Sequence, residues 1–256
     1  MIPKSKQLTE EQDFPQKGRR HWGEHFRQTS LWHNYENMRD NAEPRWPAIV
    51  ALLGSVGLFG VLPRYLSFGP RWLPAVLITF LLIPTVFTHV KEHFNLNRIL
   101  GLLIAAIETF FMIASLSKLV HSMLTPHSQM HSEPPERLLI SASALWMTNV
   151  LVFALWYWHL DAGGPNQRDT RGGHCHGSFL FPQMTMTEQS LLESRQGNWF
   201  PGFVDYLFLA FNTSTALSPA DTAVLTRWAK LLMMVQAAIS LIVIAVLAAR
   251  AINTLN

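Results

Sequence analysis

Long apolar runs separated by short polar stretches fill most of the chain after a polar start. Each run approaches the roughly 20 residues that a helix needs to cross about 30 Å of hydrocarbon. The runs cover residues 46–62, 72–90, 99–120 and 138–158, and a last helix is expected at 219–253. This pattern predicts an all-α, polytopic bundle of five to six transmembrane helices.

The stretch 202–217 decides between five and six helices. Counting Lys and Arg places the N-terminal tail and the polar loop 160–199 on one side of the membrane. A full crossing by 202–217 then puts both termini on that side, and charge slightly favours this interpretation. A re-entrant half-helix is the alternative, because Asp205 and Asn212 make a lipid-facing crossing costly.

The residues DYLFLAFNTSTALSPAD, from Asp205 to Asp221, resemble the pore helix and filter of the potassium-channel superfamily, whose pattern ends TTVGYGD. Thr215 and Asp221 match the first threonine and the aspartate of that pattern. Ser218 and Ala220 replace its two glycines, and a Cβ strains a backbone whose carbonyls must all face an ion. The resemblance therefore implies a pore-like segment without a potassium filter. Its candidate residues are Asn212, Thr213, Ser214, Thr215, Ser218 and Asp221.

The letters SPAD within this segment also fit the start of a helix. Ser218 suits the N-cap, Pro219 the first helical position, and Asp221 the first turn. On this interpretation the last helix begins at Pro219.

The C-terminal half also resembles a group of bacterial multi-pass membrane proteins, domain of unknown function 1345. The similar stretches are TNVLVFALWYWHLDAGGP, FLFPQ and DYLFLAFNTSTALSPADTAVLTRWAKLLMMVQAAIS, which together span roughly residues 149–251. The resemblance implies a multi-pass protein of the bacterial inner membrane. It implies no activity.

Composition agrees with a membrane protein, since 49% of the residues are hydrophobic and only 14% are charged. The net charge of +3 is too small to indicate nucleic-acid binding. The tail 1–45 holds eight of the twenty Lys and Arg residues, offset by seven acidic ones. We expect a cytoplasmic tail, either lying along the membrane surface or solvated without a partner.

Three polar residues fall inside the predicted helices. Glu108 is costly there when ionised, so a functional role and a protonated structural role are both open. Asn149 and Gln236 are expected to form hydrogen bonds between helices. His159 and Asp161, at a helix end, predict an interfacial pair.

A metal site is only weakly indicated. His174, Cys175 and His176 form a cluster that fits adventitious metal binding. The spacing of the other histidines marks no complete ligand set for a catalytic zinc ion. We therefore expect no cofactor and no enzymatic activity.

Three functions remain open. The first is a channel-like pore of low selectivity, formed when several copies gather the pore-like segment around an axis. The second is a proton-linked carrier of small solutes that uses Glu108. The third is a non-conducting structural or partner-binding protein. The partners expected are the lipid bilayer and further copies of the chain, without nucleic acid.

Overall fold

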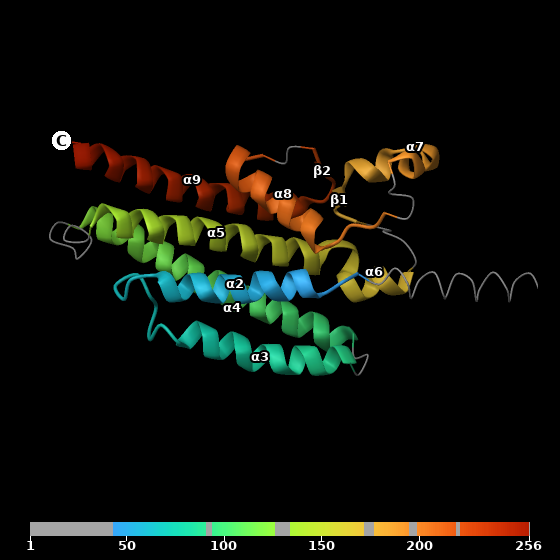
Figure 1. The fold of residues 1–256 in the computed structure, drawn as a ribbon, viewed down its shortest axis with the longest axis horizontal. Coiled ribbons are helices and arrows are strands. Elements are labelled where there is room, and N and C mark those ends of the chain that lie inside the picture. Colours follow the sequence, from blue (N-terminus) through green and yellow to red (C-terminus); the bar gives the residue numbers. More distant parts are fainter. Residues whose placement is uncertain are drawn as a thin grey trace, which may run out of the picture. The chain divides into compact units, whose positions relative to one another are not determined.

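The computed structural model describes residues 43–90, 94–125, 134–171, 177–194, 199–218 and 221–255. Nearly all secondary structure in these residues is helical, which confirms the predicted all-α class (Figure 1). Most of the predicted tail, residues 1–42, lies outside the described residues. The main helices are α2 (Trp46–Val61), α3 (Leu73–Val90), α4 (Phe94–Leu124), α5 (Pro135–Leu160), α8 (Phe203–Ala216) and α9 (Arg227–Leu255).

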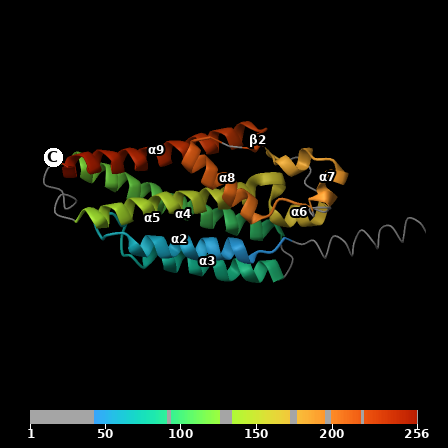
Figure 2. The ribbon, with the colours of Figure 1, turned by 45° about the horizontal axis from the view of Figure 1, so that its top comes forward.

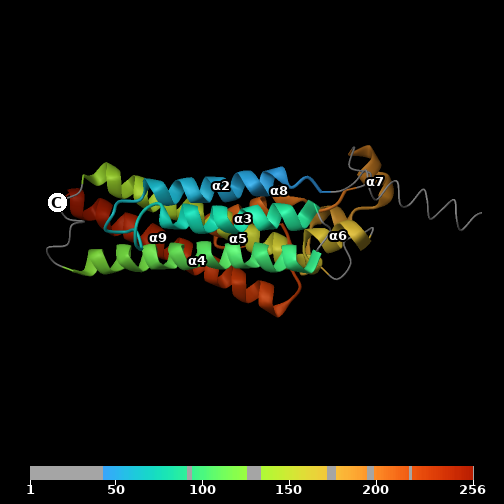
Figure 3. The ribbon, with the colours of Figure 1, turned by 90° about the horizontal axis from the view of Figure 1, so that it is seen from below.

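Helix α5 forms the centre of the bundle. It packs against α2, α4, α8 and α9, while α3 packs mainly against α4 (Figures 2 and 3). Val152, Ala154 and Tyr157 of α5 are fully buried. A helix that is apolar on all sides is typical of such a central position.

Three helices are long and apolar enough to cross a membrane, and their apolar stretches are Leu96–Leu124, Glu136–Gly163 and Arg227–Ala249. The 31 residues of α4 correspond to a length of about 46 Å. The apolar helices Trp46–Val61 and Leu73–Thr85 are shorter. Length and composition thus indicate a membrane protein.

The described residues of the predicted polar loop, 160–171, 177–194 and 199, form short elements at one end of the bundle. These elements are a 3-10 turn η2 (Asp161–Gly163), α6 (Pro165–Arg171), β1 (Phe179–Leu180), a second turn η3 (Pro182–Thr185) and α7 (Glu188–Glu193). Phe179 and Phe181 are buried in the bundle core. Gly164 has φ 93°, and a Cβ there would lie 2.9 Å from the carbonyl oxygen of His159. Glycine therefore allows the chain to turn sharply from α5 into α6.

The predicted start of the last helix at Pro219 is wrong, because α9 begins at Arg227. Before it, β2 (Ala223–Val224) pairs antiparallel with β1, with Val224 opposite Phe179. The backbone of Leu225 also donates to the carbonyl of Ser178 at 2.8 Å. Pairing with a segment about 45 residues earlier in the chain thus overrides the local helix signal of SPAD.

Candidate functional site

Helix α8 enters the bundle and ends part-way along it. Its 14 residues correspond to about 21 Å, less than the roughly 30 Å of a hydrocarbon core. Near its start, the hydroxyl of Tyr206 donates to Asp161 Oδ2 at 2.7 Å, directly after the end of α5. Helix α8 therefore begins at the bundle end that carries α6 (Figure 1).

The chain then returns to the end at which it entered. Strand β2 follows α8 and pairs with β1, which is itself tied to the end of α5 by the bond from Ser178 N to Asp161 Oδ1 at 2.5 Å. Residues 202–217 therefore turn back within the bundle. This path agrees with the re-entrant alternative, while the complete crossing that charge slightly favours stays a prediction from the sequence.

The first turn of α8 is fixed by Asp205. Its carboxylate accepts a hydrogen bond from the backbone of Gly202 at 2.8 Å, which satisfies a donor that the helix leaves free. Asp205 is thus a capping residue, placed where a negative charge is favoured by the helix dipole.

The far end of α8 is closed by a strained residue. Leu217 has φ 56° and ψ 22°, the left-handed region that glycine or asparagine usually occupies at a helix end. Thr215 and Ala216, which occupy the first two positions of the filter pattern, are still helical. Their carbonyls therefore follow the helix axis and do not form an extended row that faces a bare ion.

A buried polar network holds α8 against α5 and α9. Gln236 of α9 donates to Ala210 O at 2.7 Å and to Ser214 Oγ at 2.8 Å, and it accepts from the hydroxyl of Tyr157. Asn149 of α5 donates to Ser240 Oγ at 2.8 Å, to Ser214 Oγ at 3.4 Å and to the backbone carbonyl of Gln236 at 3.2 Å. All five side chains are fully buried. The network fixes the depth at which α8 sits between its two neighbours.

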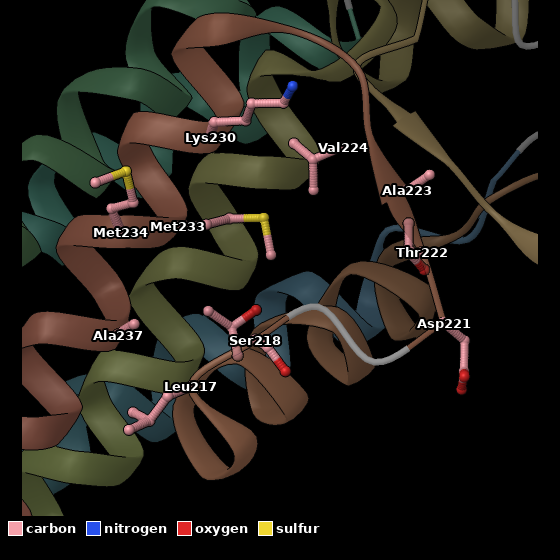
Figure 4. Close-up of a pocket in the computed structure, with 11 residues that line it drawn as sticks. Leu217, Ser218, Asp221, Thr222, Ala223, Val224, Lys230, Met233, Met234 and Ala237 are labelled. Atoms are coloured by element: carbon pink, nitrogen blue, oxygen red, sulfur yellow. The ribbon is translucent and has the colours of Figure 1, made fainter.

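An open groove of about 610 Å³ lies between the returning chain and α9 (Figure 4). Met233 points into this space, and Asp221 lies at its rim (Figure 4). The wall formed by the returning chain includes Leu217, Ser218, Asp221 and Thr222. The wall formed by α9 includes Lys230, Met233, Met234 and Ala237. Ala223 and Val224 also line it from the returning chain, so the groove combines a mixed polar and apolar wall with the largely apolar wall of α9.

No protein-family model, curated protein or solved structure matches the chain. The functional argument therefore depends on the geometry of this site.

The candidate residues of the pore-like segment separate into three groups. Thr213 lines the groove, and Ser214 belongs to the buried network. Ser218 and Asp221 line the groove from the returning chain. Asn212 is half-buried, and Thr215 is exposed with its hydroxyl bonded to Phe211 O at 2.9 Å within α8. Neither of these last two lines the groove.

The other candidates lie elsewhere. Glu108 is fully buried in α4, where its carboxylate accepts from the hydroxyl of Ser55 in α2. His174, Cys175 and His176 fall outside the described residues. Within the part of the chain that the structure describes, no group of His, Cys, Asp or Glu side chains is arranged to hold a metal ion.

A cluster at the end of α5 was not found from the sequence. Arg168 donates to Glu43 Oε2 at 3.0 Å and to the carbonyls of Trp158 and Asp161 at 2.9 and 3.0 Å. Its guanidinium also lies 5.1 Å from the ring centroid of Tyr206. Glu43 and Arg168 are far apart in the sequence, so their spacing does not predict this contact. The aromatic residues around HLDAGGP are the local signal that could have indicated a buried cluster.

The predicted pair of His159 and Asp161 does not form. His159 donates from Nδ1 to Leu155 O at 2.9 Å, whereas Asp161 accepts from Tyr206 and Ser178. His159 lies in the last turn of α5 and Asp161 in the 3-10 turn that follows, so the two side chains contact different residues.

Proposed function

We propose that the protein is a multi-pass protein of the bacterial inner membrane, with α2, α3, α4, α5 and α9 crossing and α8 re-entrant. The lengths of α4, α5 and α9 support this arrangement. Trp46 and Trp72 are 66% and 61% exposed near the ends of α2 and α3, as in an aromatic belt at the membrane surface.

We further propose that the site belongs to a channel-like pore of low selectivity. The observation that carries this proposal is the return of the chain after α8. Leu217, Ser218 and Asp221 are exposed and not helical. At membrane depth, non-helical backbone is tolerated only when protein covers it or when it lines a water-filled cavity. A water-filled path along the groove meets this requirement.

The charges around the groove favour weak selectivity. Asp221 and Lys230 are both exposed, and no ion pair joins them in the described structure. The hydroxyls of Ser218 and Thr222 are neutral. Selective pores surround the ion with carbonyls or with a ring of one charge, and this groove offers one charge of each sign.

Several copies are needed to enclose such a path. Only 33% of the apolar stretch of α9 is buried, compared with 67% for α5. The exposed side chains include Leu231, Met234, Val235 and Leu241, and Met234 also lines the groove. We propose that α9 of neighbouring copies meet through this face and form a homo-oligomer.

Currents through the protein reconstituted in planar bilayers test this function. Asp221→Lys should shift the reversal potential in a salt gradient toward that of the anion, because it leaves only positive charge at the groove. Thr215→Ala is the matched control, since this exposed hydroxyl lies on α8 outside the groove. A silent wild-type protein, or an unchanged permeability ratio in Asp221→Lys, contradicts a conducting groove.

The carrier and the non-conducting protein remain predictions from the sequence. Glu108 does not line the groove beside α9. A carrier would need a path to this carboxyl, so the geometry favours the pore.

A further inference from the structure

A second pocket lies at the end of the bundle opposite α6. It has a volume of about 500 Å³ and is formed by the connection from α2 to α3 and by the first turns of α5. Three of its lining residues are arginines: Arg64, Arg71 and Arg137. No carboxylate among the described residues lines it.

The arginines of this pocket differ from those at the α6 end. There, Arg45 and Arg168 are paired with Asp169 and Glu43 at 2.5 and 3.0 Å. Arg64 and Arg71 form no ion pair with any residue that the structure describes. The two guanidinium groups therefore offer donors that no described carboxylate of the chain occupies.

The remaining described charges do not neutralise the pocket. Glu136 is the described carboxylate near it on α5, and it is exposed and does not line the pocket. Lys118 is cationic as well, and it is engaged by a bond to Ser67 O at 2.6 Å. This end of the described structure consequently carries an excess of positive charge.

The pocket is apolar on one side. Val61 and Ile140 line it and are 51% and 52% exposed. Trp72, which directly follows Arg71, is exposed at the start of α3. An exposed Trp at a helix start is typical of the membrane–water interface, where aromatic rings lie at the level of the lipid headgroups.

We propose that this pocket binds the phosphate headgroup of an anionic phospholipid. The planar guanidinium of arginine donates two parallel hydrogen bonds to phosphate oxygens, and Arg64 and Arg71 approach the pocket from the same connection. An acyl chain then lies along Val61 and Ile140. Basic pockets between membrane helices bind acidic headgroups in this way.

The test is native mass spectrometry of the full chain in detergent, titrated with phosphatidylglycerol and, separately, with phosphatidylcholine. Phosphatidylglycerol should bind more tightly. Arg64→Gln and Arg71→Gln should each weaken its binding about fivefold, and the double variant about 25-fold, corresponding to about 1 kcal/mol for each arginine. Binding of phosphatidylcholine should change less than twofold.

Arg227→Gln is the matched control, because it removes an exposed arginine that does not line the pocket. The double variant Arg64→Lys with Arg71→Lys keeps the positive charge and is a milder change if the Gln variants misfold. It should lose part of the preference for phosphatidylglycerol over phosphatidylcholine. Equal affinity for the two lipids, or unchanged binding by a folded double Gln variant, overturns the proposal. Inorganic phosphate that displaces phosphatidylglycerol at equal concentration identifies a site for free anions and overturns the lipid assignment.

Discussion

Leu217 shows how one residue sets the course of the chain after α8. A left-handed conformation costs a residue with a Cβ about 1–2 kcal/mol, yet a leucine occupies it here. Its side chain is 42% exposed and lines the groove. The strain is therefore accepted at the point where the chain must reverse, as at many functional sites.

Substitution at this position should follow backbone preference. Leu217→Val should lower the free energy of unfolding by about 1 kcal/mol, because a branched Cβ fits positive φ poorly. Leu217→Asn should be no less stable than the wild type, since asparagine tolerates the left-handed region. Thermal unfolding in detergent, followed by circular dichroism, measures both. A Val variant as stable as the Asn variant would show that φ is not positive there.

At the scale of elements, α8 is too short to span a hydrocarbon core, and side-chain hydrogen bonds hold it in the bundle. Gln236 is the centre of this network, because it bonds α8 through Ala210 and Ser214 and α5 through Tyr157. Hydrogen bonds between membrane helices contribute about 0.6–2 kcal/mol. The position of α8 thus depends on a few polar atoms.

Gln236→Leu should lower the free energy of unfolding by about 1–2 kcal/mol, since it leaves the buried hydroxyls of Tyr157 and Ser214 with fewer partners. Thr215→Ala removes a hydroxyl of α8 that bonds only within its own helix, and it should change stability by less than about 0.5 kcal/mol. Chemical unfolding in mixed micelles compares the two. Equal effects would mean that the network does not anchor α8.

The sequence predicted the elements better than their ends and their depth. Apolar runs longer than about 15 residues give helices wherever they occur, because a buried backbone must satisfy its own hydrogen bonds. The start of α9 was misplaced, since Ser218 and Asp221 read locally as caps while Val224 pairs with Phe179. The depth of α8 depends on Asn149 and Gln236, which only the fold brings together.

Part of the candidate site was predictable from the sequence, because some of its residues carry a local signal and others do not. Hydroxyl and acidic residues between two apolar helices marked the segment around Ser218 and Asp221, and both line the groove. Lys230 and Met233 reach it from α9 and carry no local signal, because a groove wall on a long helix looks like any other helix face. The arginine pocket joins Arg64 to Arg137, two residues whose proximity no spacing in the sequence reveals.

At the scale of the whole molecule, the two ends of the described bundle differ in charge and in role. The α6 end pairs its arginines with carboxylates and receives both the start of α8 and the returning chain. The opposite end holds Arg64 and Arg71, which have no carboxylate partner among the residues that the structure describes. The start of α2 and the end of α9 lie at opposite ends of the bundle, as the proposed five crossings require (Figure 1).

Labelling of single cysteines tests the re-entrant path most directly. In a Cys175→Ser background, cysteines replace Phe200 before α8, Leu225 after the return and Arg64 at the opposite end. Phe200 and Leu225 are 44% and 56% exposed, and Arg64 is exposed too. A membrane-impermeant maleimide is applied to sealed vesicles of each orientation. We expect positions 200 and 225 to react from one side and position 64 from the other. Reaction of positions 200 and 225 from opposite sides would show that α8 crosses the membrane and would contradict the account.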